Sequence, residues 1–233
     1  MATVPSIVHG WTNTTNGTSA TGGADFTPSA TLATIAFAVA VDDSGAVPSF
    51  TLSGCGMTWT GATDGTTNQN QADPNTRGRI RAFIATAGTP SSGKLTIDCG
   101  ATTCERFILR VVELTETTFG VQPVQCVKNS GTSATPTATF GAVADAANIL
   151  LVAYIGRNPA VTFTGGWTGL ADLSVETDVR LKVMYTTNDT TADGDWSGSC
   201  DWAAIGLELD NVPAASGWGR MLGQQRFRIV TTD

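Results

Sequence analysis

Thr34-Ile-Ala-Phe-Ala-Val-Ala-Val41 is an almost wholly apolar run, and Asn148-Ile-Leu-Leu-Val-Ala-Tyr-Ile155 repeats its pattern in the second half of the chain. Both runs are too short for a core helix and rich in β-branched and aromatic residues. Short apolar runs of this kind are typical of strands that are buried on both faces. We therefore predict one central buried strand in each half of the protein.

The similarity between the two halves extends beyond these runs. Gly17-Thr-Ser-Ala-Thr21 recurs as Gly131-Thr-Ser-Ala-Thr135, Arg79-Ile-Arg-Ala-Phe-Ile84 matches Arg180-Leu-Lys-Val-Met-Tyr185, and Glu113 falls on Glu208. Self-similarity over a long period indicates a repeated structural unit, and a period of about a hundred residues is the size of a whole domain. The sequence predicts an internal duplication.

Composition favours an all-β fold. Only 14% of the 233 residues are charged and 26 are glycine, while threonine and serine are abundant. Threonine suits strands, and glycine weakens helix interiors. We predict tandem duplicated β-sandwich units of antiparallel strands, jelly-roll-like or immunoglobulin-like. The expected organisation is an N-terminal arm (1–16), a first repeat (17–116), a connector (117–130), a second repeat (131–212) and a C-terminal arm (213–233).

Charge and hydropathy argue against several partners. The net charge is −7, whereas a nucleic-acid-binding surface needs clustered lysine and arginine. The longest apolar run is far shorter than the roughly 20 residues of a membrane-spanning helix. Met1-Ala-Thr-Val-Pro5 does not resemble a secretory signal. We expect no nucleic-acid or membrane partner, and assembly in a cytoplasm.

Five cysteines are present, an odd number that cannot all pair within one chain. Cys99 and Cys104 flank a short turn and are able to bridge, but a reducing compartment would keep both as thiols. Free cysteines usually act as small apolar side chains, which is the expected role of most of them. The five are Cys55, Cys99, Cys104, Cys126 and Cys200.

No catalytic constellation is evident. His9 is the single histidine, and no nucleophile-elbow motif accompanies it, so a Ser/His/Asp triad is not expected. Two carboxylates are enough for a glycosidase, but Glu113 and Glu208 recur because the repeat recurs, and we expect them to face water. Asp189-Thr-Thr-Ala-Asp-Gly-Asp195 offers oxygen ligands for calcium, yet it lacks EF-hand spacing and is ordinary turn chemistry. We predict no enzyme activity, metal or cofactor.

The remaining features are aromatic residues and a basic tail. We expect Trp59, Trp167, Trp196 and Trp202 to pack in the core or at a subunit interface. The C-terminal segment alternates like a strand and is basic in an otherwise acidic chain. It either completes its own sheet or adds to the edge of a neighbouring subunit. The candidate contact residues, all in the two arms, are Trp11, Trp218, Arg220, Arg226, Phe227 and Arg228.

The second half also shows a family resemblance. The strand Ile149 to Ile155, the turn Gly165-Gly-Trp-Thr-Gly-Leu170, the strand Val179 to Thr186 and the strand Ala203 to Leu209 follow one another in a set order. This order resembles a β-sandwich module of bacteriophage virion proteins and bacterial surface proteins. The first half departs from it, because Gly56-Met-Thr-Trp59 replaces the Gly-Trp-Thr pattern.

The resemblance implies a structural role in a virion. The function expected from it is a capsid decoration (cement) protein or a tail-associated protein that binds the major capsid protein or other virion proteins and forms homo-oligomers. The alternative is a carbohydrate-binding or host-recognition module of a tail fibre or bacterial surface protein, with Trp59 or Trp167 stacking on sugars. A β-sandwich glycosidase is a third hypothesis.

Overall fold

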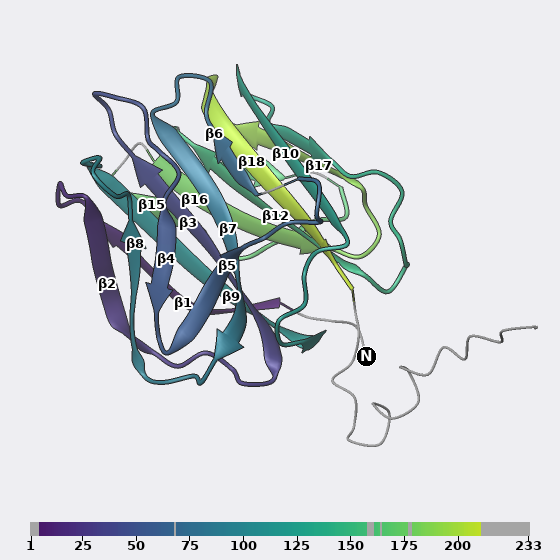
Figure 1. Ribbon diagram of the computed structural model, residues 1–233. Coiled ribbons are helices and arrows are strands. Elements are labelled where there is room, and N and C mark those ends of the chain that lie inside the picture. Colours follow the sequence, from purple (N-terminus) through teal and green to yellow (C-terminus); the bar gives the residue numbers. More distant parts are fainter. Residues whose placement is uncertain (1–4, 68, 158–160, 164, 177–178, 211–233) are drawn as a thin grey trace, which may run out of the picture.

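The computed structural model describes residues 5–67, 69–157, 161–163, 165–176 and 179–210. Over these residues the secondary structure consists of antiparallel strands joined by turns (Figure 1). The predicted all-β class, with sheets packed as sandwiches, is confirmed.

The first nine strands form one sheet, in the order β1-β9-β3-β7-β5-β4-β8-β2, with β6 paired to β7. The sheet folds over itself, because β1 contacts β2 although the two strands lie at opposite ends of this order. The result is a two-layered sandwich, called unit 1 below. Its strands are β1 (Pro5–Asn13), β2 (Ser19–Phe26), β3 (Leu32–Val41), β4 (Thr51–Gly54), β5 (Met57–Gly61), β6 (Asn70–Ala72), β7 (Gly78–Gly88), β8 (Gly93–Asp98) and β9 (Arg106–Thr118).

The next nine strands form unit 2, with the order β10-β18-β12-β16-β14, β15 paired to β16, and a separate sheet β11-β17-β13. Adding nine to the strand numbers of unit 1 reproduces each of these pairings. One pairing of unit 1 has no counterpart among the described residues, namely β4 with β5. The strands are β10 (Gln125–Ser133), β11 (Thr137–Thr139), β12 (Ile149–Gly156), β13 (Val161–Phe163), β14 (Thr168–Gly169), β15 (Leu173–Val175), β16 (Val179–Thr186), β17 (Thr191–Trp196) and β18 (Cys200–Leu209).

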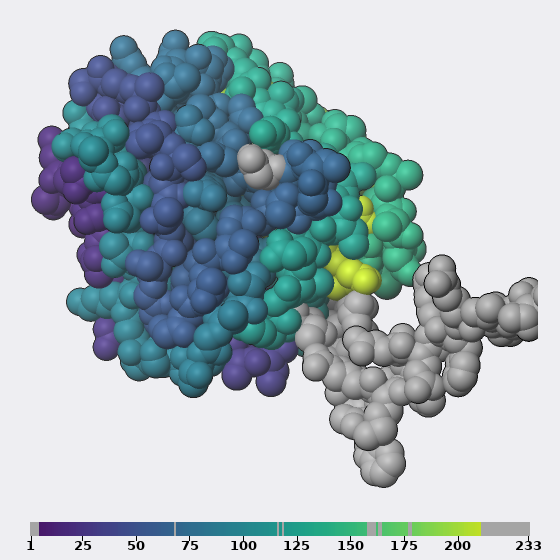
Figure 2. All heavy atoms as spheres, in the orientation of Figure 1, coloured from purple at the N-terminus to yellow at the C-terminus, as the bar shows by residue number. Residues whose placement is uncertain are grey.

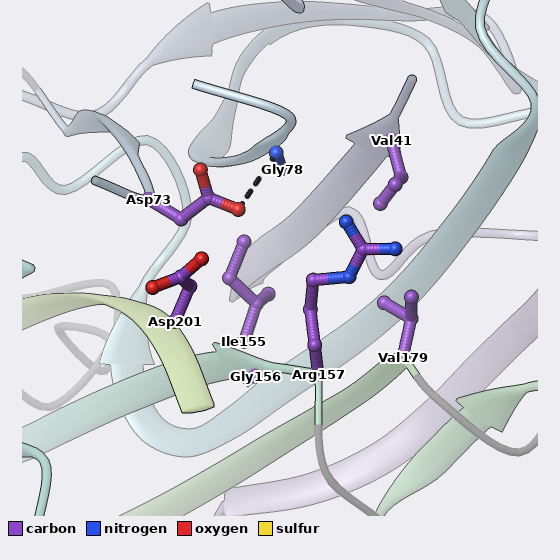
Figure 3. Close-up of a pocket in the computed structure, with 8 residues that line it drawn as sticks. All are labelled: Val41, Asp73, Gly78, Ile155, Gly156, Arg157, Val179 and Asp201. Carbon is purple, nitrogen blue, oxygen red and sulfur yellow. Dashed lines mark hydrogen bonds between the residues drawn. The ribbon is translucent and has the colours of Figure 1, made fainter. Parts of the chain in front are cut away.

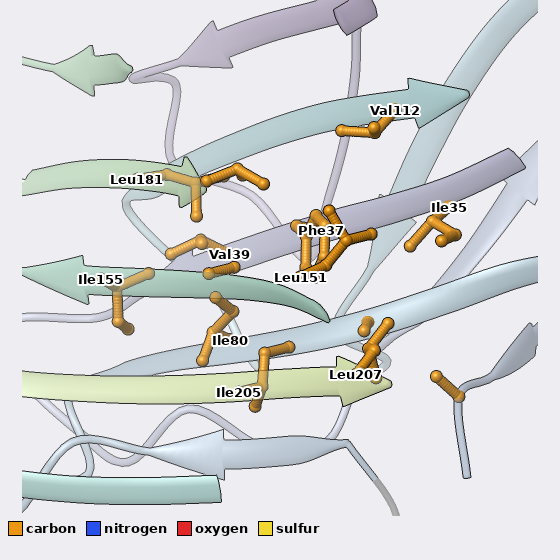
Figure 4. Close-up of a cluster of buried hydrophobic side chains, with 14 of the residues drawn as sticks. Ile35, Phe37, Val39, Ile80, Val112, Leu151, Ile155, Leu181, Ile205 and Leu207 are labelled. Carbon is orange, nitrogen blue, oxygen red and sulfur yellow. The ribbon is translucent and has the colours of Figure 1, made fainter. Parts of the chain in front are cut away.

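Four layers of strands enclose three apolar cores. The core of unit 1 lies between its two layers and includes Phe50 and Phe83. The core of unit 2 includes Tyr154 and Trp196. Between the units, the inner sheets meet face to face and build the shared core, shown in Figure 4, to which Phe37 and Leu151 belong. The two units are thus joined by apolar packing as extensive as that inside each one.

This layering explains why the runs Thr34–Val41 and Asn148–Ile155 are almost wholly apolar. In β3, Ile35, Phe37, Val39 and Val41 point into the shared core, while Ala36, Ala38 and Ala40 point into the core of unit 1. β12 does the same, with Leu151 and Ile155 toward the shared core and Val152 and Tyr154 toward the core of unit 2. A strand that lies between two cores has no wet face, so its sequence does not alternate. The prediction of a buried strand in each half is confirmed.

Some of the contacts between the units are reciprocal, as a two-fold axis between them would require. Strand β1 packs on β15, and their counterparts β10 and β6 pack on each other. Likewise β9 packs on β15, and β18 on β6. Such reciprocal contacts define an isologous interface, in which the same patch of both units is used. The reciprocity is partial, because β7 also packs on β12 and β18 of unit 2 and the counterpart β16 has no such extensive contact with β3 and β9 among the described residues.

The strand pairing corrects the expected boundaries. Most of the expected N-terminal arm (1–16) is not an arm, because Pro5–Asn13 is strand β1 and pairs with β9, while residues 1–4 lie outside the described residues. Its counterpart β10 begins inside the expected connector (117–130) and ends in the expected second repeat. Both strands alternate weakly and lie at the sheet edge, so their sequences carry little signal.

The alignment of the repeats also shifts. Ile35 pairs with Ile84 and Val112, while Leu151 pairs with the equivalent Tyr185 and Leu207. Ile35 therefore corresponds to Leu151, two residues beyond the Ile149 of the sequence alignment. A shift of two keeps every side chain on the same face, so the predicted burial is unaffected.

Candidate functional site

Of the predicted contact residues, the structure describes only Trp11, and it contradicts the prediction. The Trp11 side chain is 5% exposed and belongs to the core of unit 1. It lies over Gly22 and Gly23, where a Cβ atom would approach the indole ring to about 3 Å. Glycine at these positions leaves room for the ring. The other candidates, Trp218, Arg220, Arg226, Phe227 and Arg228, lie outside the described residues.

The tryptophans inside the repeats are all buried, as predicted, with exposed fractions from 2% for Trp196 to 9% for Trp59. Trp59 and Trp167 occupy equivalent places, because Gly61 pairs with Phe83 as Gly169 pairs with Met184. Both indole rings donate to a backbone carbonyl, Trp59 to Gly54 at 3.2 Å and Trp167 to Thr191 at 2.9 Å. The repeated motif is thus Trp-Thr-Gly, and its ring faces are covered rather than presented to a sugar.

The paired carboxylates are structural clamps. Glu113 accepts hydrogen bonds from the Ser29 amide at 2.7 Å and from the Thr34 hydroxyl at 3.2 Å. Glu208 accepts them from the Ala144 amide and the Asn148 side chain, both at 2.7 Å. Each carboxylate therefore fixes the segment that leads into the central strand of its unit. Glu208 is 1% exposed, so the expectation that these carboxylates face water is wrong for it.

The segment Asp189 to Asp195 is divided between a turn and a strand. Asp189 accepts a hydrogen bond from the Thr191 amide at 3.0 Å, a local turn contact. Asp193 and Asp195 lie on the exposed face of β17, and Asp193 accepts a hydrogen bond from the Thr137 hydroxyl at 2.9 Å. Within the described ranges no group of three or more metal-ligating side chains is found.

Charged residues gather where one end of the shared core reaches the surface, a region called the seam below. Arg106 of unit 1 pairs with Glu176 of unit 2 at 2.5 Å, and Arg157 of unit 2 pairs with Asp43 of unit 1. Asp43 also pairs with Arg106 at 2.5 Å. Burial alone raises the pKa of Asp43, but the hydrogen bonds and the positive charges of Arg106 and Arg157 together bring the pKa below its ordinary value. The network is a polar clamp between the units.

Beside this network lies a small cavity, shown in Figure 3, with a volume of about 10 Å³, enough for roughly one water molecule. Asp73 faces it and accepts hydrogen bonds from the Gly78 and Arg77 amides at 2.9 and 3.0 Å. Burial raises the pKa of Asp73, and these hydrogen bonds only partly oppose the shift. The cavity is too small for an organic ligand. Its lining consists of Val41, Asp73, Gly78, Ile155, Gly156, Arg157, Val179 and Asp201.

A second clamp comes from the long segment between β5 and β7, which is rich in polar residues and contains β6. Asp64 caps its own turn through Thr66 and Thr67 and also accepts the Cys126 amide of unit 2 at 2.9 Å. Gln71 donates to the Ser130 hydroxyl of unit 2 at 3.0 Å. This segment therefore ties the two units together, and Figure 2 shows them in contact across the face viewed. Its role was missed because the partner residues lie far away in the sequence.

The outer sheets present hydroxyl groups. On unit 1, Thr21 and Thr96 face each other across β2 and β8, with their hydroxyl oxygens 2.5 Å apart. Thr51, Ser53 and Thr58 are exposed on the adjacent β4 and β5. On unit 2, Thr137, Thr139 and Thr162 flank the two aspartates of β17. These sheets lie on opposite sides of the four-layered body, and that of unit 2 is the more acidic.

Comparison with known proteins gives no relative: no protein-family model, curated protein or solved structure matches the chain. Over the residues that the structure covers, no helix has the length and hydropathy needed to cross a membrane.

Proposed function

We propose that this chain is a non-enzymatic structural protein of a bacteriophage virion, namely a capsid decoration (cement) protein that binds the outside of the shell. One observation supports the proposal above the others. Two units of the same topology share a central apolar core and carry hydroxyl-rich sheets on opposite sides of the molecule. A rigid body with two related faces is suited to bridging neighbouring, similar sites on a shell.

The burial pattern supports the same role. Glu208 and the repeat tryptophans are the side chains best suited to chemistry or to stacking on a ligand. They are buried, and their hydrogen bonds hold neighbouring segments of the fold in place. The cavity at the seam has room for only about one water molecule. What the described surface offers a partner is flat sheet faces with threonine hydroxyls, which suit protein contacts made over a wide area.

The proposal assigns the main contact to the C-terminal arm (213–233). Arg220, Arg226 and Arg228 are basic in a chain whose net charge is −7. In this proposal the chain is located in the virion. It binds the major capsid protein or other virion proteins, and it forms homo-oligomers. Opposite charge speeds association and selects the partner surface.

Co-sedimentation with expanded phage shells that lack their decoration protein tests this function. The full-length chain is expected to pellet with shells to a saturable ratio. A variant with Arg220, Arg226 and Arg228 changed to alanine should bind at least about tenfold more weakly, a loss of about 1.4 kcal/mol. The control removes two exposed cations of the sandwich body that lie outside the outer sheets, by changing Arg77 and Lys128 to alanine, and should bind as the wild type does.

Two outcomes count against the proposal. Failure of the full-length chain to pellet with any shell removes the decoration role. Specific binding on a glycan array by the same preparation favours the carbohydrate-binding alternative. In that case binding should depend on the exposed hydroxyls and carboxylates of the outer sheets, because the repeat tryptophans are buried.

A further inference from the structure

Two of the five cysteines lie next to each other. The sulfur atoms of Cys99 and Cys104 are 3.2 Å apart, and their side chains are 3% and 0% exposed. Both are free thiols in the structure. The other three behave as isolated small side chains; Cys55, for example, donates from its sulfur to the Gly93 carbonyl at 3.3 Å.

The backbone holds the two cysteines in position from outside the turn that joins them. The Cys99 amide donates to the Thr18 carbonyl at 2.8 Å, and the Cys104 amide donates to the Gly17 carbonyl at 2.9 Å. The Gly17 amide returns a hydrogen bond to the Cys104 carbonyl at 3.0 Å. Both cysteines are thereby anchored to the same short segment before β2. These hydrogen bonds do not involve residues 100–103, so the two cysteines stay side by side when the turn changes its conformation.

The turn itself is short, exposed and held by local hydrogen bonds, one of them from the Gly100 amide to the Asp98 carboxylate at 2.8 Å. Its residues 100, 101 and 103 are exposed, and the backbone hydrogen bond that closes it, from the Thr102 amide to the Cys99 carbonyl, is long at 3.4 Å. Local opening of such a turn is far less costly than unfolding of the strands around it. A small oxidant can therefore reach the thiols without disturbing the anchors at residues 17 and 18.

We propose that Cys99 and Cys104 form a redox-sensitive pair that converts from dithiol to disulfide in the folded protein. The two sulfurs need to approach by only about 1.2 Å to reach the S–S distance of roughly 2.05 Å. The bond would link the end of β8 to the start of β9 at the edge of the unit 1 core. The inference does not depend on the proposed function.

A low-molecular-weight disulfide such as oxidised glutathione supplies the oxidant. The Cys104 thiolate attacks one glutathione sulfur, releases one glutathione thiol and forms a mixed disulfide. Cys99 then loses its proton, attacks the Cys104 sulfur and releases the second glutathione. Two electrons pass from the cysteine pair to the oxidant, which ends as two thiols. The same two steps balance equally if Cys99 reacts with glutathione first and Cys104 closes the bond.

Thiol titration tests the pair directly. The reduced chain should show all five thiols in denaturant. After the native protein has been incubated with oxidised glutathione, two should be lost, and peptide mapping should place the new bond between Cys99 and Cys104. The oxidised protein is expected to melt about 4–8 °C higher, and dithiothreitol should reverse both changes.

Variants separate this pair from general thiol oxidation. Cys99→Ala and Cys104→Ala should each abolish the intramolecular disulfide, whereas Cys55→Ser should leave it intact. If a variant folds poorly, peptide mapping of the oxidised wild-type chain still shows which two cysteines form the disulfide. Five thiols remaining after native oxidation, or a disulfide that joins any other two cysteines, would overturn the proposal.

Discussion

The two units share a strand order but not a packing solution. In unit 1 the β4–β5 hairpin continues the sheet from the inner to the outer layer. In unit 2 the described residues show no pairing between the equivalent β13 and β14, and the outer layer is a separate sheet of three short strands. The central strand also differs: β3 turns three alanines to its own core, whereas β12 turns Leu150, Val152 and Tyr154 to its own.

The pairing order and the sizes of the core side chains therefore vary independently between the two units. The small residues of β3 share their core with larger side chains from β4, β5 and β7, such as Leu52, Trp59 and Phe83. What both units keep is the apolar face toward the shared core. We infer that this shared face is the constraint common to both units.

The largest expected effect comes from the shared core. Phe37→Ala in unit 1 and Leu151→Ala in unit 2 each remove a fully buried side chain from it. Each change should lower the free energy of unfolding by about 3–5 kcal/mol, through lost burial and the cavity left behind. Urea unfolding should show one cooperative transition for both variants. A variant in which one unit melts while the other persists would contradict a shared core.

A smaller effect should separate the two private cores. Gly156 lies under Trp196, and a Cβ atom there would come within 2.5 Å of the indole ring. Gly156→Ala should therefore cost about 1–3 kcal/mol, since the ring is enclosed and the overpacking cannot be relieved. The equivalent test in unit 1 is Gly22→Ala under Trp11, where the contact is 2.9 Å and the ring lies nearer the surface. We expect this variant to lose less stability in the same thermal or urea assay.

Next in size is the clamp at the seam. Asp43→Asn removes the ion pairs of Asp43 with Arg106 and Arg157 but keeps its shape. Because the carboxylate is partly exposed, we expect a loss of only about 1 kcal/mol at neutral pH, falling in high salt. Measuring the free energy of unfolding at two salt concentrations checks this, with Asp98→Asn on the exposed face of β8 as control. Equal losses of stability at both positions would contradict a stabilising role for the ion pairs at the seam.

The smallest effect concerns pH. Burial raises the pKa of Asp64, but hydrogen bonds from Thr67, Thr66 and Cys126 outweigh it and lower the pKa from 3.8 to about 2. A carboxylate with a lowered pKa in the folded state stabilises the fold above its unfolded pKa, and this stability is lost as the pH falls through the folded pKa. The contribution should therefore disappear between about pH 4 and pH 2. Asp64→Asn should be less stable than wild type at pH 6, and the difference should vanish near pH 2 in thermal melts.

Much of the inner architecture was predictable from sequence, because a strand between two cores has a distinctive composition. The runs around Phe37 and Leu151 have no polar face, and this indicated both central strands. The match of Glu113 to Glu208 also identified equivalent positions, since each carboxylate clamps its own unit in the same way.

The edges and the seam were not predictable in the same way. Strand β1 is held by its ladder to β9 and by Trp11, so its own pattern of apolar residues is irregular and resembled an arm. The clamps between units join residues far apart in sequence, such as Asp43 with Arg157 and Asp64 with Cys126. No spacing rule reports such pairs, because only the packing of two folded units brings them together.

Native-state hydrogen exchange in increasing denaturant tests whether both units form one body through the shared core. We predict that the slowest amides of β3 and β12 exchange with the same free energy, equal to that of global unfolding, because neither strand can be exposed without opening the shared core. Exchange of β12 at clearly lower denaturant than β3 would contradict this prediction and would make unit 2 an independent domain.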